Sequence, residues 1–199
     1  MQLQFLGATD TVTGSRYVLD TGRDRVMVDC GLFQGYKTLR LRNWDPLPVD
    51  PASLDGVVLT HAHLDHSGYL PLLVRNGFRG SAYCTMGTAQ LCGILLPDSA
   101  HLAAEDAAYA NRKGFSRHRP TLPPYTSADV EHALRRLGPT HYGQHFTVVP
   151  GVEAEFSRAG HIVGSAIVTL LAQGQRIVFS GDLGRQHDLV MRAPEAEAG

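Results

Sequence analysis

Short apolar stretches bounded by turn residues open the chain. Residues 3–6, 16–19 and 26–29 each form such a stretch between Gly, Thr or Asp residues, which is typical of a β-meander. Residues 57–60 form a further short and mostly apolar run, which indicates a buried strand. The first third of the chain therefore predicts strands joined by turns.

The pattern changes to helical spacing after these strands. Apolar residues predict a helix from 67 to the Asn76-Gly77 pair, which is a stop signal. A second helix is predicted over 88–96, because Pro97 follows it, and a third over 100–110. These segments indicate a helical layer in the middle of the chain.

Strand patterns return in the last third of the chain. Thr126 and Asp129 have the spacing of a capping box, so a further helix is predicted from there through Leu137. Four strands are then predicted, over 146–149, 152–156, 166–171 and 176–180. Strands, helices and strands again predict an α/β fold in which two sheets are faced by helices.

The composition is that of one globular domain. The chain has 199 residues, 43% hydrophobic and 19% charged, and its net charge of -1 gives no general attraction to nucleic acid. We expect one domain over 1–190, with 191–199 as a flexible tail or the start of a linker. No apolar run approaches the length of a membrane span, and residues 1–4 lack the basic and apolar regions of a secretory signal, so we expect a cytoplasmic protein without membrane contacts. Three cysteines at unrelated spacings indicate neither a disulfide framework nor a zinc finger.

Four possible metal ligands occur within six residues, directly after the apolar run at 57–60. His61, His63 and Asp65 alternate with other residues and so point to one side of an extended backbone, and His66 follows. Imidazole nitrogens and a carboxylate that converge suit zinc or a similar divalent ion. A surface histidine cluster is the alternative, but this density of ligand-type residues favours a metal site.

Two more candidates lie downstream, each beside glycines that allow close backbone approach. His161 follows Gly160, and Asp182 follows Gly181. Each alone is a weak signal, because Gly-Asp is a common turn and His161 can be an ordinary core residue. Four or more such ligands exceed the needs of one tetrahedral zinc with an open position. Either the site is closed or a second ion is present.

These motifs, in this order, resemble the metallo-β-lactamase superfamily. Segments 28–35, 60–68, 159–166 and 180–185 are further similar to its β-CASP branch, RNA-processing nucleases that include the pre-mRNA 3′-end endonuclease. The resemblance covers nearly the whole chain. It implies a four-layer αββα sandwich, incomplete at its C-terminal end, and a ribonuclease activity on single-stranded RNA.

The resemblance also implies a site for two divalent ions, zinc or alternatively manganese. His61, His63 and His161 would hold one ion, and Asp65 and His66 the other. Two ions about 3.5–4 Å apart clamp the attacking and leaving oxygens of a phosphodiester and lower the pKa of a bridging water.

Three carboxylates would take part in catalysis. Asp65 would bind the second ion, Asp182 would bridge the two ions, and Asp29 would orient a ligand. The β-CASP enzymes continue into a cap domain, and one of its histidines completes the second metal site. No residue after Asp188 matches that histidine. We expect the cap and the general acid to be absent, and water or a second copy in a homodimer to fill the open position.

A cationic segment is the candidate RNA contact, because phosphate contacts carry most sequence-independent affinity. A solvated loop is the alternative. For Ser15 and Arg16, the sequence allows either a contact with substrate or a structural role. The cations of the segment are Arg112, Lys113, Arg117 and Arg119.

Three functions remain open. The first is hydrolysis of RNA phosphodiesters. The second is hydrolysis of a small ester, thioester or lactam, which the absence of a cap favours. The third is a catalytically weak, metal-stabilised module that binds RNA or a partner subunit.

Overall fold

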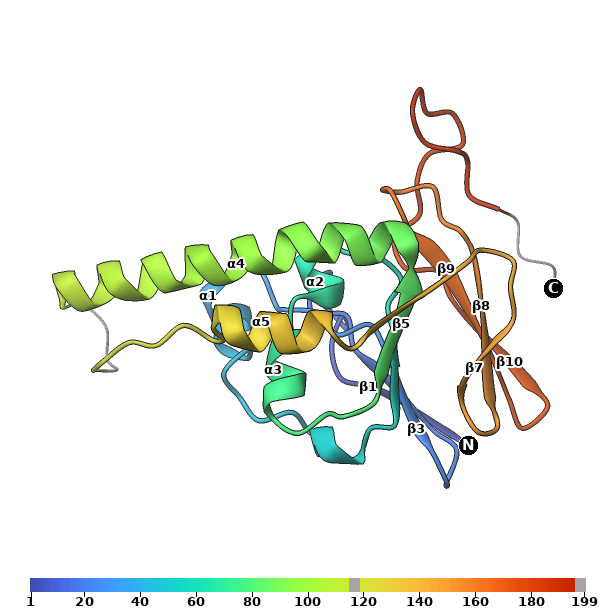
Figure 1. Ribbon diagram of the computed structural model, residues 1–199, viewed down its shortest axis with the longest axis horizontal. Helices are drawn as coiled ribbons and strands as arrows, with labels where there is room; N and C mark the ends of the chain where they lie inside the picture. The colour runs from blue at the N-terminus through green and yellow to red at the C-terminus, as the bar shows by residue number, and fades with distance from the viewer. Residues whose placement is uncertain (115–118, 196–199) are drawn as a thin grey trace.

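Two β-sheets pack face to face in the computed structural model, which describes residues 1–114 and 119–195 (Figure 1). The larger sheet has the order β1-β2-β3-β4-β5-β6, with bounds Gln2–Phe5, Tyr17–Asp20, Arg25–Val28, Gly56–Val58, Ser81–Thr85 and Leu137–Thr140. The smaller sheet has the order β10-β9-β8-β7, and in chain order its strands β7 to β10 are Phe146–Val149, Val152–Arg158, Ala166–Ala172 and Gln175–Phe179.

The strand pairing follows the predicted order of elements. Strands β1, β2 and β3 pair antiparallel, which confirms the opening meander, whereas β3 to β6 pair in parallel. The smaller sheet is antiparallel throughout. All eight predicted strands are present within one or two residues of their expected ends. Strands β5 and β6 were not predicted, because their sequences are rich in small residues and β6 contains Pro139, which an edge strand tolerates.

Five helices of the described residues lie on the outer side of the larger sheet (Figure 1). They are α1 (Lys37–Leu41), α2 (Leu64–Ser67), α3 (Leu70–Arg75), α4 (Met86–Lys113) and α5 (Ser127–Leu134), and a short 3-10 turn spans Pro51–Ser53. The capping box of α5 is confirmed, since Thr126 Oγ1 accepts from the Asp129 N–H at 3.3 Å and Asp129 Oδ2 accepts from the Thr126 N–H at 2.8 Å. The prediction that this helix reaches Leu137 is wrong, because Leu137 pairs with Ala82 as the start of β6.

Helix α4 is one continuous helix of 28 residues, so the predicted break at Pro97 is wrong. A proline inside a helix removes one backbone hydrogen bond and crowds the preceding turn. Cys92, Leu96 and Ala100 are buried on one face that continues past the proline, and this packing keeps the helix intact. Among the described residues, no helix has both the length and the apolar character needed to cross a bilayer.

Two apolar cores hold the layers together. One lies between the helices and the larger sheet around Tyr69, Phe78 and Leu96. The other lies between the sheets, where Val58 of β4 and Phe156 of β8 belong to one buried cluster. The described residues thus form a helical layer and two sheet layers of the expected four-layer sandwich. Their helices do not cover the outer face of the smaller sheet (Figure 1).

The two sheets are also joined at one edge, where the candidate ligands gather. The carboxyl ends of β3 and β4 lead into Asp29 and Thr60, and the Ala166 N–H at the start of β9 donates to the Thr60 carbonyl at 2.8 Å. Near the C-terminus, Glu195 pairs with Arg158 of β8 at 3.3 Å. The expectation of a flexible segment from 191 stays a prediction, and its residues 196–199 lie outside the described part.

Candidate metal centre

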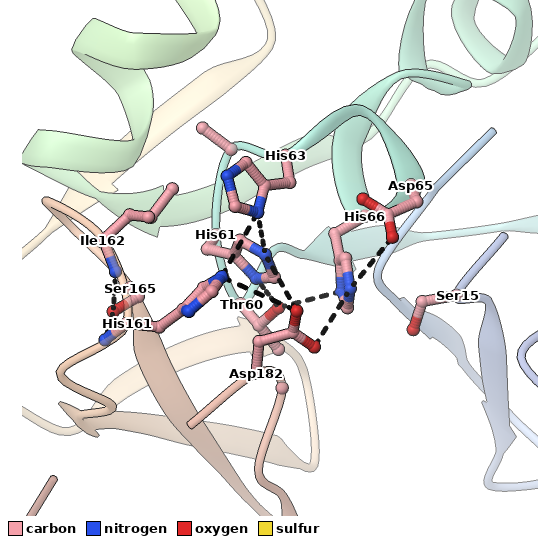
Figure 2. Close-up of polar contacts among 12 residues, drawn as sticks. Ser15, Thr60, His61, His63, Asp65, His66, His161, Ile162, Ser165 and Asp182 are labelled. Carbon is pink, nitrogen blue, oxygen red and sulfur yellow. Dashed lines mark hydrogen bonds and ion pairs between the residues drawn. The ribbon is translucent and has the colours of Figure 1, made fainter. Parts of the chain in front are cut away.

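Three histidines and one aspartate converge at this edge of the sheets. His61, His63, His161 and Asp182 each offer one ligand atom, and these four atoms all lie within 4.8 Å of one another. His63 Nδ1 lies 3.2 Å from His61 Nε2 and 3.3 Å from His161 Nε2, and Figure 2 shows the rings turned toward a common point. The sequence pattern placed these residues in one site, and the fold brings them together.

The spacing of these nitrogens fits a tetrahedral ion. Zinc–nitrogen bonds of 2.0–2.1 Å in a tetrahedron place neighbouring ligand atoms roughly 3.3 Å apart. The two contacts of His63 Nδ1 have this length. Asp182 Oδ2 lies 3.6 Å from His161 Nε2 and 4.0 Å from His61 Nε2, so it completes a set of three nitrogens and one oxygen. The residues present therefore fit a divalent metal ion.

Asp182 also faces a second pair of ligand-type residues. Its other oxygen, Oδ1, lies 3.4 Å from His66 Nε2, and that same nitrogen lies 3.9 Å from Asp65 Oδ2. The carboxylate of Asp182 thus presents one oxygen to the histidine group and the other to His66 (Figure 2). This is the arrangement that a bridging ligand requires.

Asp29 holds the imidazole of His66 from behind. Its Oδ2 accepts a hydrogen bond from His66 Nδ1 at 2.7 Å and another from Ser15 Oγ at 3.2 Å, while Oδ1 accepts from the Thr60 N–H at 2.8 Å. The proton of His66 therefore sits on Nδ1, and Nε2 points toward Asp182. Such contacts orient metal-binding histidines.

Thr60 sets the proton position of a second histidine. Its Oγ1 lies 2.9 Å from Asp29 Oδ1 and 3.0 Å from His61 Nδ1. A carboxylate only accepts, so the single hydroxyl proton goes to Asp29, and Oγ1 accepts from His61 Nδ1–H. The Nε2 lone pair of His61 is then directed into the site. Thr60 lies within the predicted motif, but sequence reasoning gave it no role.

Burial and neighbouring charges separate the pKa values of the histidines. Burial, followed by the nearby His66 and other imidazoles, lowers the pKa of His61 to about 2. Burial and His161 also lower the pKa of His63. Burial opposes the charged form of His66, but the hydrogen bond and charge of Asp29 outweigh it and raise its pKa. His61 and His63 are thus neutral at neutral pH, as ligands must be.

The backbone of the ligand turn at 63–66 is clamped by neighbouring loops. The Ser15 N–H donates to the Asp65 carbonyl at 2.8 Å, and the Cys30 N–H donates to the His66 carbonyl at 2.6 Å. A Cβ atom on Gly31 would lie only 1.6 Å from the Asp65 carbonyl oxygen, so only glycine fits there. Local sequence gives no signal for this clamp, because its partners are far apart in the chain.

Ser15 and Arg16 have structural roles. Their exposed fractions are 2% and 3%, so neither faces a substrate. Arg16 Nε donates to the Gly31 carbonyl at 2.7 Å, and its guanidinium stacks on Tyr69 at 4.0 Å. This buried arginine therefore supports the loop that clamps the ligand turn.

The loop that carries His161 is fixed by hydroxyl groups that sequence reasoning missed. Ser165 Oγ accepts from the His161 N–H at 3.0 Å (Figure 2). Thr85 and Thr88, at the start of α4, donate their hydroxyls to the Gly164 carbonyl at 2.6 and 2.9 Å. These contacts tie the histidine to the first turn of α4.

The cationic segment lies at the far end of the same helix. Arg112 and Lys113 form the last turn of α4 and are not in a loop, and Arg119 Nη2 donates to the Gly114 carbonyl at 3.4 Å. A helix of 28 residues is about 42 Å long. Since its first turn touches the His161 loop, these cations are remote from the candidate metal centre. Arg117 lies outside the described residues.

A comparison with protein families identifies the superfamily of the chain. Residues 10–197 match the model of the metallo-beta-lactamase superfamily. The chain belongs to the metallo-beta-lactamase superfamily, which confirms the resemblance drawn from the motifs.

Relatives with names that refer to RNA or transcription match nearly the whole chain. Ribonuclease TTHA0252 of Thermus thermophilus is 39% identical over 194 residues, which are 98% of this chain and 40% of the relative. Transcription termination factor FttA of Methanocaldococcus jannaschii is 30% identical over 185 residues, 92% of this chain and 27% of the relative. The chain thus spans less than half the length of these relatives.

Solved structures support the fold alone. A B3 metallo-beta-lactamase with an active-site glutamic acid gives a TM-score of 0.54 at 20% identity, over 94% of this chain and 64% of that one. A metallo-beta-lactamase motif mutant of Cronobacter sakazakii gives 0.53 at 21% identity, over 89% and 58%.

Proposed function

We propose that this chain is the metal-binding part of a hydrolase that cuts phosphodiester bonds of single-stranded RNA. The observation that carries the proposal is the position of Asp182, whose two carboxylate oxygens face the His61–His161 group and His66. The ribonuclease among its relatives supports RNA as the substrate. We place the protein in the cytoplasm, where such an RNA substrate is present.

The donor sets suit two divalent ions, with zinc as our first choice and manganese as the alternative. His61, His63, His161 and Asp182 would hold one ion, and Asp65, His66 and Asp182 the other. Such a pair of ions, when bound, would activate water and stabilise the charge that develops on a phosphodiester. The second set has three protein donors. Water or a residue of a second copy in a homodimer would complete it.

The protein's own residues do the positioning. Thr60 and Asp29 accept the Nδ1 protons of His61 and His66, so the Nε2 atom of each ring faces the site. Asp182 faces His161 on one side and His66 on the other. Its side chain is 47% exposed, and that of His161 is 27% exposed. The centre therefore opens to solvent, as access by a polymer requires.

The test is an assay on three substrates: single-stranded RNA, a chromogenic phosphodiester and a chromogenic lactam, each with zinc and then with manganese. We expect metal-dependent cleavage of RNA and of the phosphodiester, at a low rate because no general acid is identified. General acid catalysis is typically worth about 10²–10⁴-fold. Asp182→Asn should abolish this activity, and Asp98→Asn, on the exposed face of α4, should leave it unchanged. Efficient lactam cleavage without RNA cleavage would replace the nuclease proposal with a small-molecule hydrolase.

A further inference from the structure

A groove rich in arginine lies between α3 and α5. It encloses about 640 Å³ and is open to solvent, and the residues that line it are Val74, Arg75, Arg79, Asp129, His132, Arg135 and Arg136. Four of its seven side chains are permanently cationic. The whole chain has a net charge of -1, so this concentration of charge is local.

The one carboxylate in the groove is already used by the protein. Asp129 Oδ2 accepts from the Thr126 N–H at 2.8 Å and lies 2.9 Å from Thr126 Oγ1, within the capping box of α5. The same oxygen lies 3.5 Å from Arg75 Nη1. Asp129 therefore offsets one of the four cations. Glu131, outside the groove lining, lies 3.9 Å from the Arg135 guanidinium in an exposed pair, so two acids face four cations and a net positive charge remains for a ligand.

Two of the guanidinium groups are held in place by backbone carbonyls. Arg79 Nη1 donates to the Val74 and Phe78 carbonyls at 2.9 and 3.0 Å, and Arg136 Nη1 donates to the Arg79 carbonyl. A guanidinium has five N–H donors, so these contacts fix each group and leave further donors for a ligand. Fixed guanidinium forks are suited to phosphate oxygens.

The groove is separate from the metal centre. Arg79 and Arg136 lie just before β5 and β6, at the amino ends of these parallel strands. His61 and His63 follow the carboxyl end of β4, which is parallel to β5. The groove thus lies at the amino ends of the parallel strands and the metal centre at their carboxyl ends. A phosphate bound in the groove is therefore not the phosphate that is cut.

We infer that the arginine groove binds phosphate groups of a single-stranded RNA at a distance from the cleaved bond. RNA as the ligand rests on the proposed function, whereas the phosphate chemistry rests on the groove itself. An open groove with several guanidinium groups fits successive phosphates of an extended strand. Its contribution is to affinity and not to the chemical step.

The test is binding of a fluorescent oligouridylate by the full chain in excess chelator, where hydrolysis cannot occur. Arg75→Gln with Arg135→Gln changes two cations whose side chains are 43% and 66% exposed. We expect this pair to raise Kd by roughly three- to tenfold and to reduce the salt dependence of log Kd by about 1.4, or 0.7 for each lost phosphate contact. Arg23→Gln with Arg40→Gln is a control of equal charge on exposed residues elsewhere and should change neither.

A measurement on the unaltered chain removes any dependence on how the variants fold. The oligouridylate should protect Arg75 and Arg135 from phenylglyoxal, whereas inorganic phosphate at the same concentration should protect them less. The inference would be overturned if the Arg75→Gln, Arg135→Gln variant bound the oligouridylate as tightly as wild type and the oligouridylate gave no protection from phenylglyoxal. So would loss of binding only in Arg112→Gln with Lys113→Gln, which would place the contact at the end of α4. The binding assay needs no metal, so its result is independent of the cleavage assay. If the chain binds RNA through the groove but does not cleave RNA when metal is supplied, the inference about the groove stands and only the proposed catalysis is rejected.

Discussion

The buried carboxylate of Asp29 accepts a 2.7 Å hydrogen bond from Nδ1 of His66. This contact leaves Nε2 of the imidazole directed at Asp182. Asp29 has a φ of 56°, in the left-handed region, and its own N–H donates to the Val58 carbonyl at 2.9 Å. Asp29 thus adopts an unfavourable backbone conformation at the point where its carboxylate must face the candidate metal ligand His66.

Asp29→Asn should weaken metal binding without removing it. The amide keeps the size of the side chain but loses the charge that supports His66, and changes of this kind typically cost about 10–100-fold in metal affinity. Competition with a chromophoric chelator measures the effect. An unchanged affinity would show that Asp29 does not orient His66.

Thr60→Val should lower metal affinity by a similar factor, about 10–100-fold. Valine has nearly the same shape but offers no acceptor to His61 Nδ1, so the ring loses the contact that fixes its proton. Thr60→Ser keeps the hydroxyl and should restore the affinity. Nitrogen-15 NMR of the metal-free chain should show the His61 proton on Nδ1 in wild type and a mixture of tautomers in the valine variant. An Nε2 proton in wild type would contradict the assignment.

Gly31→Ala and Gly93→Ala should have opposite effects on stability. A Cβ at Gly31 meets the Asp65 carbonyl oxygen at 1.6 Å, so the clamp on the ligand turn must shift, at a typical cost of about 1–3 kcal/mol. A Cβ at Gly93 meets nothing within 4 Å, and alanine in an exposed helix stabilises by about 0.4–1 kcal/mol. Urea unfolding measures both. Equal stability of the two variants would contradict the packing described for Gly31.

Metal-free protein should lose stability as the pH falls below about 6.5, and His61 should be a main cause. Its pKa is lowered to about 2 by burial and by the neighbouring imidazoles, so the folded chain keeps it neutral while the unfolded chain takes up a proton. One such group reduces the free energy of unfolding by about 1.4 kcal/mol for each pH unit below that value.

The control is His61→Gln, which cannot titrate. His66 has the opposite sign, because its pKa is raised and its contribution is present at low pH and lost as the pH rises. The difference between wild type and His61→Gln therefore isolates one residue. A difference that stays constant from pH 7.5 to 5.5 would show that His61 is not kept neutral by the fold.

The sequence predicted which candidate ligands would come together, but it did not predict the contacts that support them. His61, His63 and His161 carry local signals, since each lies in a short motif at the end of a strand. The contacts that fix them do not. Ser15 and Gly31 meet the ligand turn only through the pairing of distant loops, and nothing in their local sequence indicates that contact.

The same distinction explains the errors in the fold. Pro97 is a strong local signal for a helix end, but the buried face that runs from Cys92 to Ala100 outweighs it. Strand β6 contains Gly138 and Pro139 and forms because β5 offers a parallel edge, which only the assembled sheet provides.

The metal content of the purified chain tests the central claim most directly. Protein prepared without chelator and titrated with zinc should hold at least one ion per chain and approach two. Asp182→Asn should lose the second ion and bind the first more weakly, because its carboxylate faces both groups of ligands. Less than about a tenth of an equivalent in wild type, with no uptake on titration, would contradict the assignment of a metal centre to residues of this type. Two ions retained in Asp182→Asn would contradict the bridge.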